Sequence, residues 1–170
     1  MDIALIFARI LHVSLGILWV GSMFFLSTFL MPSLQEAGPD AGKVVAALTR
    51  RKFMIVLPII ALVTLLSGLY LYWRVSAGFA PEYMRSGPGQ TYGLGAALAI
   101  VAFILGISIT RPAMIKATQL GQAAMSAAAG EKEAMMAEAQ KLRARSASVG
   151  RIIFALLIGS TLAMSIGRYV

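Results

Sequence analysis

The sequence predicts an all-α, polytopic membrane protein, in which four transmembrane helices form a single domain over residues 1–170. Three observations predict this fold class: the apolar content, the length of four apolar runs, and the distribution of charge between the connecting segments. Apolar residues make up 59% of the chain, and the mean hydropathy is +0.81; water-soluble domains are far less apolar. Each run approaches or exceeds the roughly 20 residues that a helix needs to cross about 30 Å of hydrocarbon. The runs are residues 3–31, 53–73, 92–110 and 149–169.

Lysines and arginines gather in two of the three segments that connect these runs. The middle connection holds only Arg74 and Arg85, whereas the first and third connections with their flanks hold most of the others. The positive-inside rule then predicts that both termini face the periplasm and both basic connections face the cytoplasm of a bacterial inner membrane. We expect these cations to contact anionic lipids, and their distribution argues against a nucleic-acid partner.

Tyrosine and tryptophan predict the same orientation independently. One group of aromatic residues falls at the predicted outer ends of the helices or in the outer connection: Tyr70, Tyr72, Trp73, Tyr83, Tyr92 and Tyr169. Such residues are enriched where a helix passes through the membrane–water interface.

The third and fourth helices are expected to continue beyond the membrane as an antiparallel cytoplasmic hairpin, residues 113–148. This segment is rich in residues that form helices well. We expect its break at Ala129-Gly130-Glu131, because Gly130 fits a helix C-cap and Glu131 suits the start of the next helix. The expected apolar seam consists of Met125, Met135, Met136 and Leu142. Packing of the hairpin against itself is favoured over a groove for a partner.

The two hairpins resemble each other weakly. The first and third helices each meet a proline near the inner interface, at Met31-Pro32 and at Arg111-Pro112. A basic stretch then precedes each returning helix. This pattern indicates an internal repeat of two helical hairpins, as some membrane proteins have. Glycines in the runs, among them Gly68, are expected where helices approach closely.

His12 is the only histidine of the chain, and it lies inside the first apolar run. An ionisable residue in a membrane span is costly and therefore indicates a functional site. Arg9, His12, Gly16, Trp19 and Met23 follow each other at steps of three and four, so they share one helix face. An imidazole with a glycine one turn away suits a porphyrin, whose iron takes histidine as an axial ligand. Arg9 is then placed to pair with the haem propionates.

Simpler and competing interpretations remain open. A lone histidine in a membrane also forms hydrogen bonds to neighbouring helices without any cofactor. Because no second histidine exists, the other axial ligand is Met164, a group from a second subunit, or absent. Copper is the competing metal, since methionine and histidine suit Cu(I), although no cluster of paired methionines accompanies His12. The chain has no cysteine, which excludes thiolate metal sites and Cys-anchored haem.

The first and last helices carry a resemblance to a known family. The segment LHVSLGILWVGSMFF, Leu11–Phe25, resembles the first helix of the CopD-like membrane superfamily, and Met164–Tyr169 resembles the last helix. That superfamily includes copper-resistance D-type proteins, HemJ-type protoporphyrinogen oxidases and related small membrane proteins. The resemblance implies a four-helix fold with haem b at the first-helix histidine, a position that His12 matches. The intramembrane lysine of the HemJ-type enzymes has no counterpart, since every lysine here lies in or beside a connecting segment.

These observations yield one leading hypothesis and two alternatives. The leading hypothesis is a haem-b-binding membrane protein with a redox or electron-transfer role. In it His12 is the metal ligand and Arg9 and Arg168 lie near the propionates. The alternatives are a non-catalytic accessory subunit that docks on a larger membrane complex, and copper handling. The sequence leaves open whether a cofactor is bound and whether the chain forms homo-oligomers.

Overall fold

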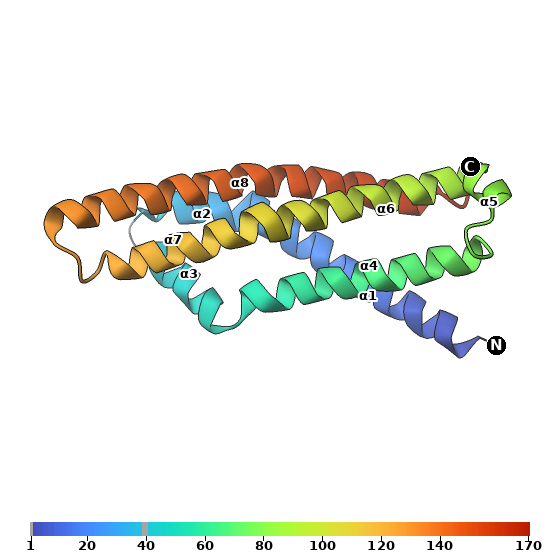
Figure 1. The fold of residues 1–170 in the computed structure, drawn as a ribbon, viewed down its shortest axis with the longest axis horizontal. Coiled ribbons are helices and arrows are strands. Elements are labelled where there is room, and N and C mark those ends of the chain that lie inside the picture. Colours follow the sequence, from blue (N-terminus) through green and yellow to red (C-terminus); the bar gives the residue numbers. More distant parts are fainter. Residues whose placement is uncertain (1, 39–40) are drawn as a thin grey trace.

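The structure, a computed structural model, describes residues 2–38 and 41–170, and these residues contain helices and turns but no strand. Four helical stretches are long and apolar enough to cross a membrane: Ile3–Glu36, Phe53–Val75, Gly87–Ala123 and Ala129–Ile166. The predicted all-α fold of a multi-pass membrane protein is confirmed. The elements, shown in Figure 1, are α1 (Ile3–Phe25), η1 (Leu26–Leu30), α2 (Met31–Glu36), α3 (Ala41–Arg50), α4 (Phe53–Val75), α5 (Pro81–Arg85), α6 (Gly87–Leu105), η3 (Gly106–Thr110), α7 (Arg111–Ala123) and α8 (Ala129–Ile166).

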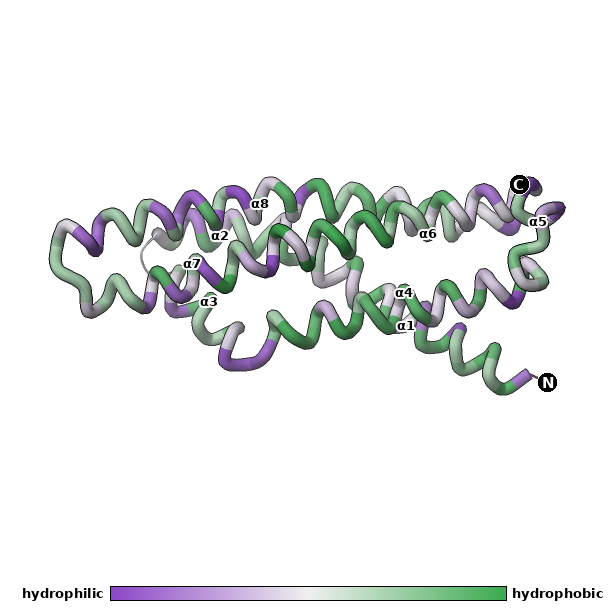
Figure 2. Tube along the Cα trace, viewed as in Figure 1, coloured by the Kyte–Doolittle hydropathy of each residue, from purple (hydrophilic) through white to green (hydrophobic). Residues whose placement is uncertain are grey.

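The molecule is elongated, and its two ends differ. Helices α6, η3 and α7 follow one another in a single rod that runs antiparallel to α8 along the whole length (Figure 1). Both chain termini and α5 lie at one end, the terminal end, and the turn between α7 and α8 lies at the other, the hairpin end. Hydrophilic residues gather toward the hairpin end, at the turn between α3 and α4 and around α5 and the chain termini, whereas apolar residues dominate the middle (Figure 2).

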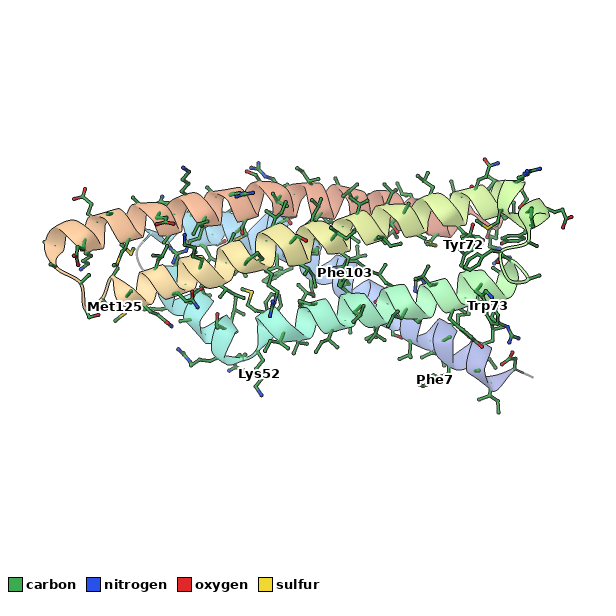
Figure 3. All side chains as sticks on the ribbon, viewed as in Figure 1. Phe7, Lys52, Tyr72, Trp73, Phe103 and Met125 are labelled. Carbon is green, nitrogen blue, oxygen red and sulfur yellow. The ribbon has the colours of Figure 1, made fainter. Side chains whose placement is uncertain are left out.

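Helix α1 crosses α4 obliquely. Its N-terminal half pairs with α4 and lies away from α8, as Figure 1 shows. Farther along, α1 enters the core, where Trp19 packs edge-on against Phe103 of α6 with ring centroids 6.5 Å apart. Ile153 and Leu157 of α8 complete this core and are each only 2% exposed. Figure 3 shows Phe103 in the middle of the molecule and Phe7 near the free end of α1. Many other apolar side chains are exposed, as expected of helices in lipid.

The first and third membrane helices each contain a turn of π-helix. Segment η1 ends two residues before Pro32, and η3 ends two residues before Pro112. Proline has no N–H and collides with the carbonyl four residues earlier in an α-helix, and the wider π turn relieves that conflict. Because of this arrangement the helices do not stop at their prolines, and the first helix continues to Glu36. The two hairpins thus share a local structure as well as a sequence pattern.

The third membrane helix begins at Gly87, earlier than the predicted residue 92. Ser86 is its N-cap and its Oγ accepts a hydrogen bond from the Gly89 N–H at 3.2 Å. Pro88 lies in the first turn, where a missing N–H costs nothing. At their terminal ends, α4 extends to Val75 and α8 ends at Ile166, three residues before the predicted limit.

The hairpin differs from its prediction in the position of its break. The turn lies at residues 124–128, and Gly130 is inside α8, so the predicted C-cap at Gly130 is wrong. Ser126 explains the earlier end, because its Oγ donates to the Ala123 carbonyl at 3.3 Å and competes with helix continuation. Glu131 lies in the first turn of α8, as predicted.

Small residues form the seam between α7 and α8. Ala117 and Ala139 are fully or almost fully buried, and Met114 beside them is 5% exposed. Met125, predicted in the seam, is instead 85% exposed and lies at the turn, as Figure 3 shows. Met135, Met136 and Leu142 are half-buried. Alanine lets two helix backbones approach closely, so the seam is built from alanines rather than methionines.

Candidate functional site

The His12 side chain points from α1 to α4. Its Nδ1 lies 2.8 Å from the carbonyl oxygen of Thr64. A carbonyl oxygen can only accept, so Nδ1 carries the proton and donates it. The other ring nitrogen, Nε2, has no hydrogen-bond partner among the residues that the structure describes. An imidazole nitrogen left open in this way can ligate a metal when it carries no proton.

Gly68 makes room for this ring. A Cβ built on Gly68 would lie 2.6 Å from His12 Cε1 and 2.8 Å from Nδ1, distances at which real atoms collide. The imidazole thus occupies the volume of a missing side chain on α4. Gly16, one turn along α1, lies opposite Thr64, and a Cβ there would be 3.6 Å from the Thr64 methyl, an ordinary contact. His12 and Gly16 together bring α1 and α4 into close contact.

The His12 ring lies at the level of Gly68, inside the membrane-spanning part of α4. Gly68 is seven residues from Val75, the last residue of the helix, which corresponds to a depth of about 10 Å from the terminal end. His12 is half-buried. Tyr70 and Trp73, whose ring centroids are 6.1 Å apart, lie between this level and the helix end. The imidazole thus lies farther from the end of α4 than these two aromatic side chains.

The other predicted site residues are not all brought to His12. Arg9 is exposed, and the Asp2 carboxylate beside α1 pairs with Arg74 of α4 instead. The Arg168 guanidinium lies 4.9 Å from the centre of the Tyr169 ring. Met164 belongs to the pair of α6 and α8, where its methyl group would lie 3.0 Å from a Cβ on Gly95. His12 and Met164 therefore belong to different helix pairs, α1 with α4 and α6 with α8.

Metal binding by several side chains has no support from the geometry. In residues 2–38 and 41–170, no three His, Cys, Asp or Glu side chains lie close enough to hold an ion. A metal at His12 would thus need most of its ligands from a macrocycle, a second chain or sulfur. Haem supplies four ligands from its own ring and leaves one or two axial positions to the protein.

Sequence reasoning missed both partners of His12. The Thr64 partner is a backbone carbonyl, which no pattern of side chains reveals. Gly68 was expected at a close helix approach, but nothing in the sequence paired it with His12. The available signal was depth, since His12 and Gly68 both lie in the outer part of their predicted spans.

A second feature is a half-open cavity in the half of the bundle nearer the hairpin. This central cavity of about 130 Å³ is lined by residues of both π segments, among them Ser27, Gly106 and Thr110. Trp19, Phe103 and Ile153 provide much of its apolar wall. An apolar protein cavity of similar volume can hold a molecule as large as benzene. π turns frequently mark functional sites.

Helix α8 is hydrogen-bonded to both π segments beside this cavity. Ser146 Oγ donates to the Thr110 carbonyl at 3.2 Å, and Ser27 Oγ donates to the Gly150 carbonyl at 3.5 Å. Ser146 and Gly150 are one helical turn apart, so the two bonds lie next to each other on α8. The hydroxyl of Thr110 has no such partner, and its oxygen is buried.

Arg111 compensates for a proline in α4. Pro58 lies inside α4 and leaves the carbonyl four residues earlier, that of Met54, without its helical donor. The Arg111 Nε donates to this same Met54 carbonyl at 3.3 Å. Sequence reasoning assigned Arg111 only to membrane orientation; the proline in the second apolar run was the signal that a carbonyl needed a donor.

Comparisons of the chain with protein-family models, with curated proteins and with solved structures find no match. The resemblance of Leu11–Phe25 to the CopD-like superfamily stays a prediction.

Proposed function

We propose that the protein binds haem b in a bacterial inner membrane, with His12 as an axial ligand, and takes part in electron transfer. The observation that carries the proposal is the hydrogen bond from His12 Nδ1 to the Thr64 carbonyl. Metal-binding histidines almost always donate their second ring N–H in this way, which fixes the tautomer and makes the ligating nitrogen more basic.

The surroundings of His12 fit such a ligand. Gly68 holds the ring at a fixed position on α4, so the direction of Nε2 is set before any ligand arrives. Arg9 is exposed one turn nearer the terminal end, where its guanidinium can pair with a carboxylate. A bound haem would supply a centre that gains and loses one electron. The second axial ligand is proposed to come from Met164, after the helix pairs approach, or from a second copy of the chain.

We further propose that the terminal end faces the periplasm and the hairpin end faces the cytoplasm. The connection between α2 and α4 and the hairpin of α7 and α8 contain most of the lysines and arginines. The short connection with α5, at the terminal end, contains few. Haem at His12 would then lie near the periplasmic side, with the Arg9 and Arg168 side chains toward the aqueous phase.

Absorption spectra of the detergent-purified protein, supplied with haem during expression, test this function. We expect a Soret band and an α-band on reduction, and we expect His12→Ala to lose both. Gly68→Ala should shift or weaken the bands, because the new methyl group pushes against the imidazole. Gly21→Ala is the matched control on α1, since a Cβ there meets nothing within 4 Å.

A colourless protein, or a spectrum that His12→Ala leaves unchanged, would overturn the haem site. Copper retained by the wild type and lost from His12→Ala would instead support copper handling. A protein that binds neither but co-purifies with a membrane complex would support the accessory-subunit hypothesis. These outcomes are distinguishable in one preparation by spectra, metal analysis and native mass.

A further inference from the structure

Basic side chains from two helices, α3 and α8, line a second cavity at the hairpin end. This basic groove has a volume of about 450 Å³ and is lined by α3, α7, α8 and the turn between the last two. Its cations are Lys43 and Arg50 of α3 and Lys132 and Arg143 of α8. Among the residues that the structure describes, none that lines the groove is acidic. Orientation in the membrane explains why cations occur in these segments, but it does not require them to converge on one cavity.

Arg143 distinguishes the groove from an ordinary solvated surface. Its guanidinium lies over Gly121 of α7, where a Cβ would be 3.4 Å from Nη2. Its Nε is buried and has no hydrogen-bond partner among the described residues. A buried charged donor without a partner is costly. An acceptor held in the groove would remove that cost.

The neighbouring ion pair does not supply the acceptor. Lys116 and Glu138 pair with each other at 2.6 Å across α7 and α8, and neither residue lines the groove. The polar groups that do line it beside the cations are Thr118 and Gln122 of α7. The Thr118 hydroxyl already donates to the Met114 carbonyl at 2.9 Å, whereas the Gln122 amide can donate to an oxygen held in the groove. The groove therefore combines positive charge with one neutral donor, a combination that suits an oxyanion.

The length of the groove indicates the size of the ligand. Lys132 and Arg143 are eleven residues apart on α8, which corresponds to about 16 Å. Arg50 lies three residues before the start of α4 and so marks the end of the groove nearest the membrane. Because the backbone positions of these cations differ by several helical turns, a chain of phosphate groups can contact more of them at once than a single phosphate can.

We propose that the basic groove binds a polyanion that carries several phosphate groups. Arg143 provides the planar fork that pairs with phosphate oxygens, and Arg50 and Lys132 contact the more distant charges. Two sources share this chemistry: a soluble polyphosphate or nucleotide, and the headgroups of anionic lipids next to Arg50. The distance that the groove extends from the start of α4 favours the soluble source.

Calorimetry with inorganic tripolyphosphate, on the full chain in an uncharged detergent, tests the soluble source. We expect Arg143→Gln to weaken binding by about tenfold or more, since one charge-assisted hydrogen bond is lost. Arg145→Gln, an equal loss of charge at an exposed position outside the groove, should change binding less than about twofold. Arg50→Gln and its neighbour Arg51→Gln form a second matched pair, because only Arg50 lines the groove. This pair decides the outcome if Arg143→Gln unfolds.

Nanodiscs of neutral lipid, with and without phosphatidylglycerol, test the lipid source. Stabilisation by phosphatidylglycerol that Arg143→Gln and Arg50→Gln abolish, and that Arg145→Gln and Arg51→Gln retain, would support the groove with lipid as its ligand. Either arm with this pattern of variants supports the proposal. Failure to bind in both arms overturns it, as does equal weakening by the groove variants and their matched controls, which would mean that only net charge matters.

Discussion

The imidazole of His12 fills the volume that Gly68 leaves empty on α4, so close that a Cβ on Gly68 would lie 2.6 Å from His12 Cε1. The two residues are therefore one packing unit shared between two membrane helices. This unit fixes the ring whether or not a ligand is bound. It also separates the structural role of His12 from its proposed chemical role, because the two roles use different atoms.

Gly68→Ala should lower the free energy of unfolding in detergent by about 1–3 kcal/mol, since an added methyl group overpacks the α1–α4 interface. In a His12→Ala background the same change should cost much less, because the ring that it meets is gone. Denaturant titration of the four proteins in this double-mutant cycle measures the coupling. Additive effects would contradict the contact, and Gly21→Ala on α1, the helix of His12, serves as the neutral reference.

Arg111→Ala should lower the free energy of unfolding by about 1 kcal/mol, because the Met54 carbonyl loses its donor. Pro58→Ala restores a backbone N–H four residues after Met54, so in that background the arginine should matter less. The same unfolding experiment, done as a cycle, measures this. Arg145→Ala, at an exposed position on α8, controls for the general loss of a positive charge; a loss as large as that of Arg111→Ala would refute the assignment.

Thr110→Val should leave the stability unchanged or raise it by about 1 kcal/mol, because the Thr110 hydroxyl is buried without a partner. Ser160→Ala is the contrasting variant. Its hydroxyl donates to the Gly95 carbonyl at 2.8 Å in a buried position, so its loss should destabilise by about 1 kcal/mol. Thermal unfolding of both variants compares the Thr110 hydroxyl, which has no hydrogen-bond partner among the described residues, with the Ser160 hydroxyl, which donates a hydrogen bond. Destabilisation by Thr110→Val would reveal a bond at Oγ1.

Single cysteines will report the proposed orientation without interference, because the chain has no native cysteine. Met125→Cys, 85% exposed at the hairpin turn, should react with a membrane-impermeant maleimide only in inverted vesicles. Tyr169→Cys, at a position 76% exposed at the opposite end, should react in intact spheroplasts. The reverse pattern would overturn the proposed orientation and leave the fold untouched.

The sequence was sufficient to predict the four apolar helices and the extension of the last two into a hairpin, because each depends on local composition. It was not sufficient to predict how the helices meet. The sequence predicted that Arg9, His12, Trp19 and Met23 share one helix face, but not how much of that face packs inside the bundle. In the structure Trp19 and Met23 are buried but Arg9 is exposed, since α1 leaves the bundle as it crosses α4. Helix crossing angles depend on long-range packing, which local patterns do not contain.

The seam between α7 and α8 also shows that local sequence patterns do not predict how helices pack. Methionine is the larger and more apolar residue, so a pattern based on hydropathy selects Met125 and Met136. The helices instead approach through Ala117 and Ala139, where the advantage is small volume rather than apolar area. Arg143 also owes its significance to three-dimensional neighbours, because only the packing of α7 on α8 buries its Nε. A sequence shows how many charged residues a segment has, but not which of their charged groups are buried in the folded protein.

The two π segments determine where a membrane helix of this chain can lose one residue. An i to i+5 turn holds one residue more than an α turn, and in both helices the surplus residue precedes the proline at the same spacing. Deleting one residue within 26–30 would restore an α turn and return Pro32 to its collision with the preceding carbonyl. If Pro32 were replaced as well, the flanking faces would keep their mutual orientation. Elsewhere in a span, a single deletion rotates everything beyond it by about 100°. The extra residue of each π turn and the proline that follows it are thus expected to be gained or lost together. At these two sites a membrane helix can lose one residue without turning its lipid-facing surface inward.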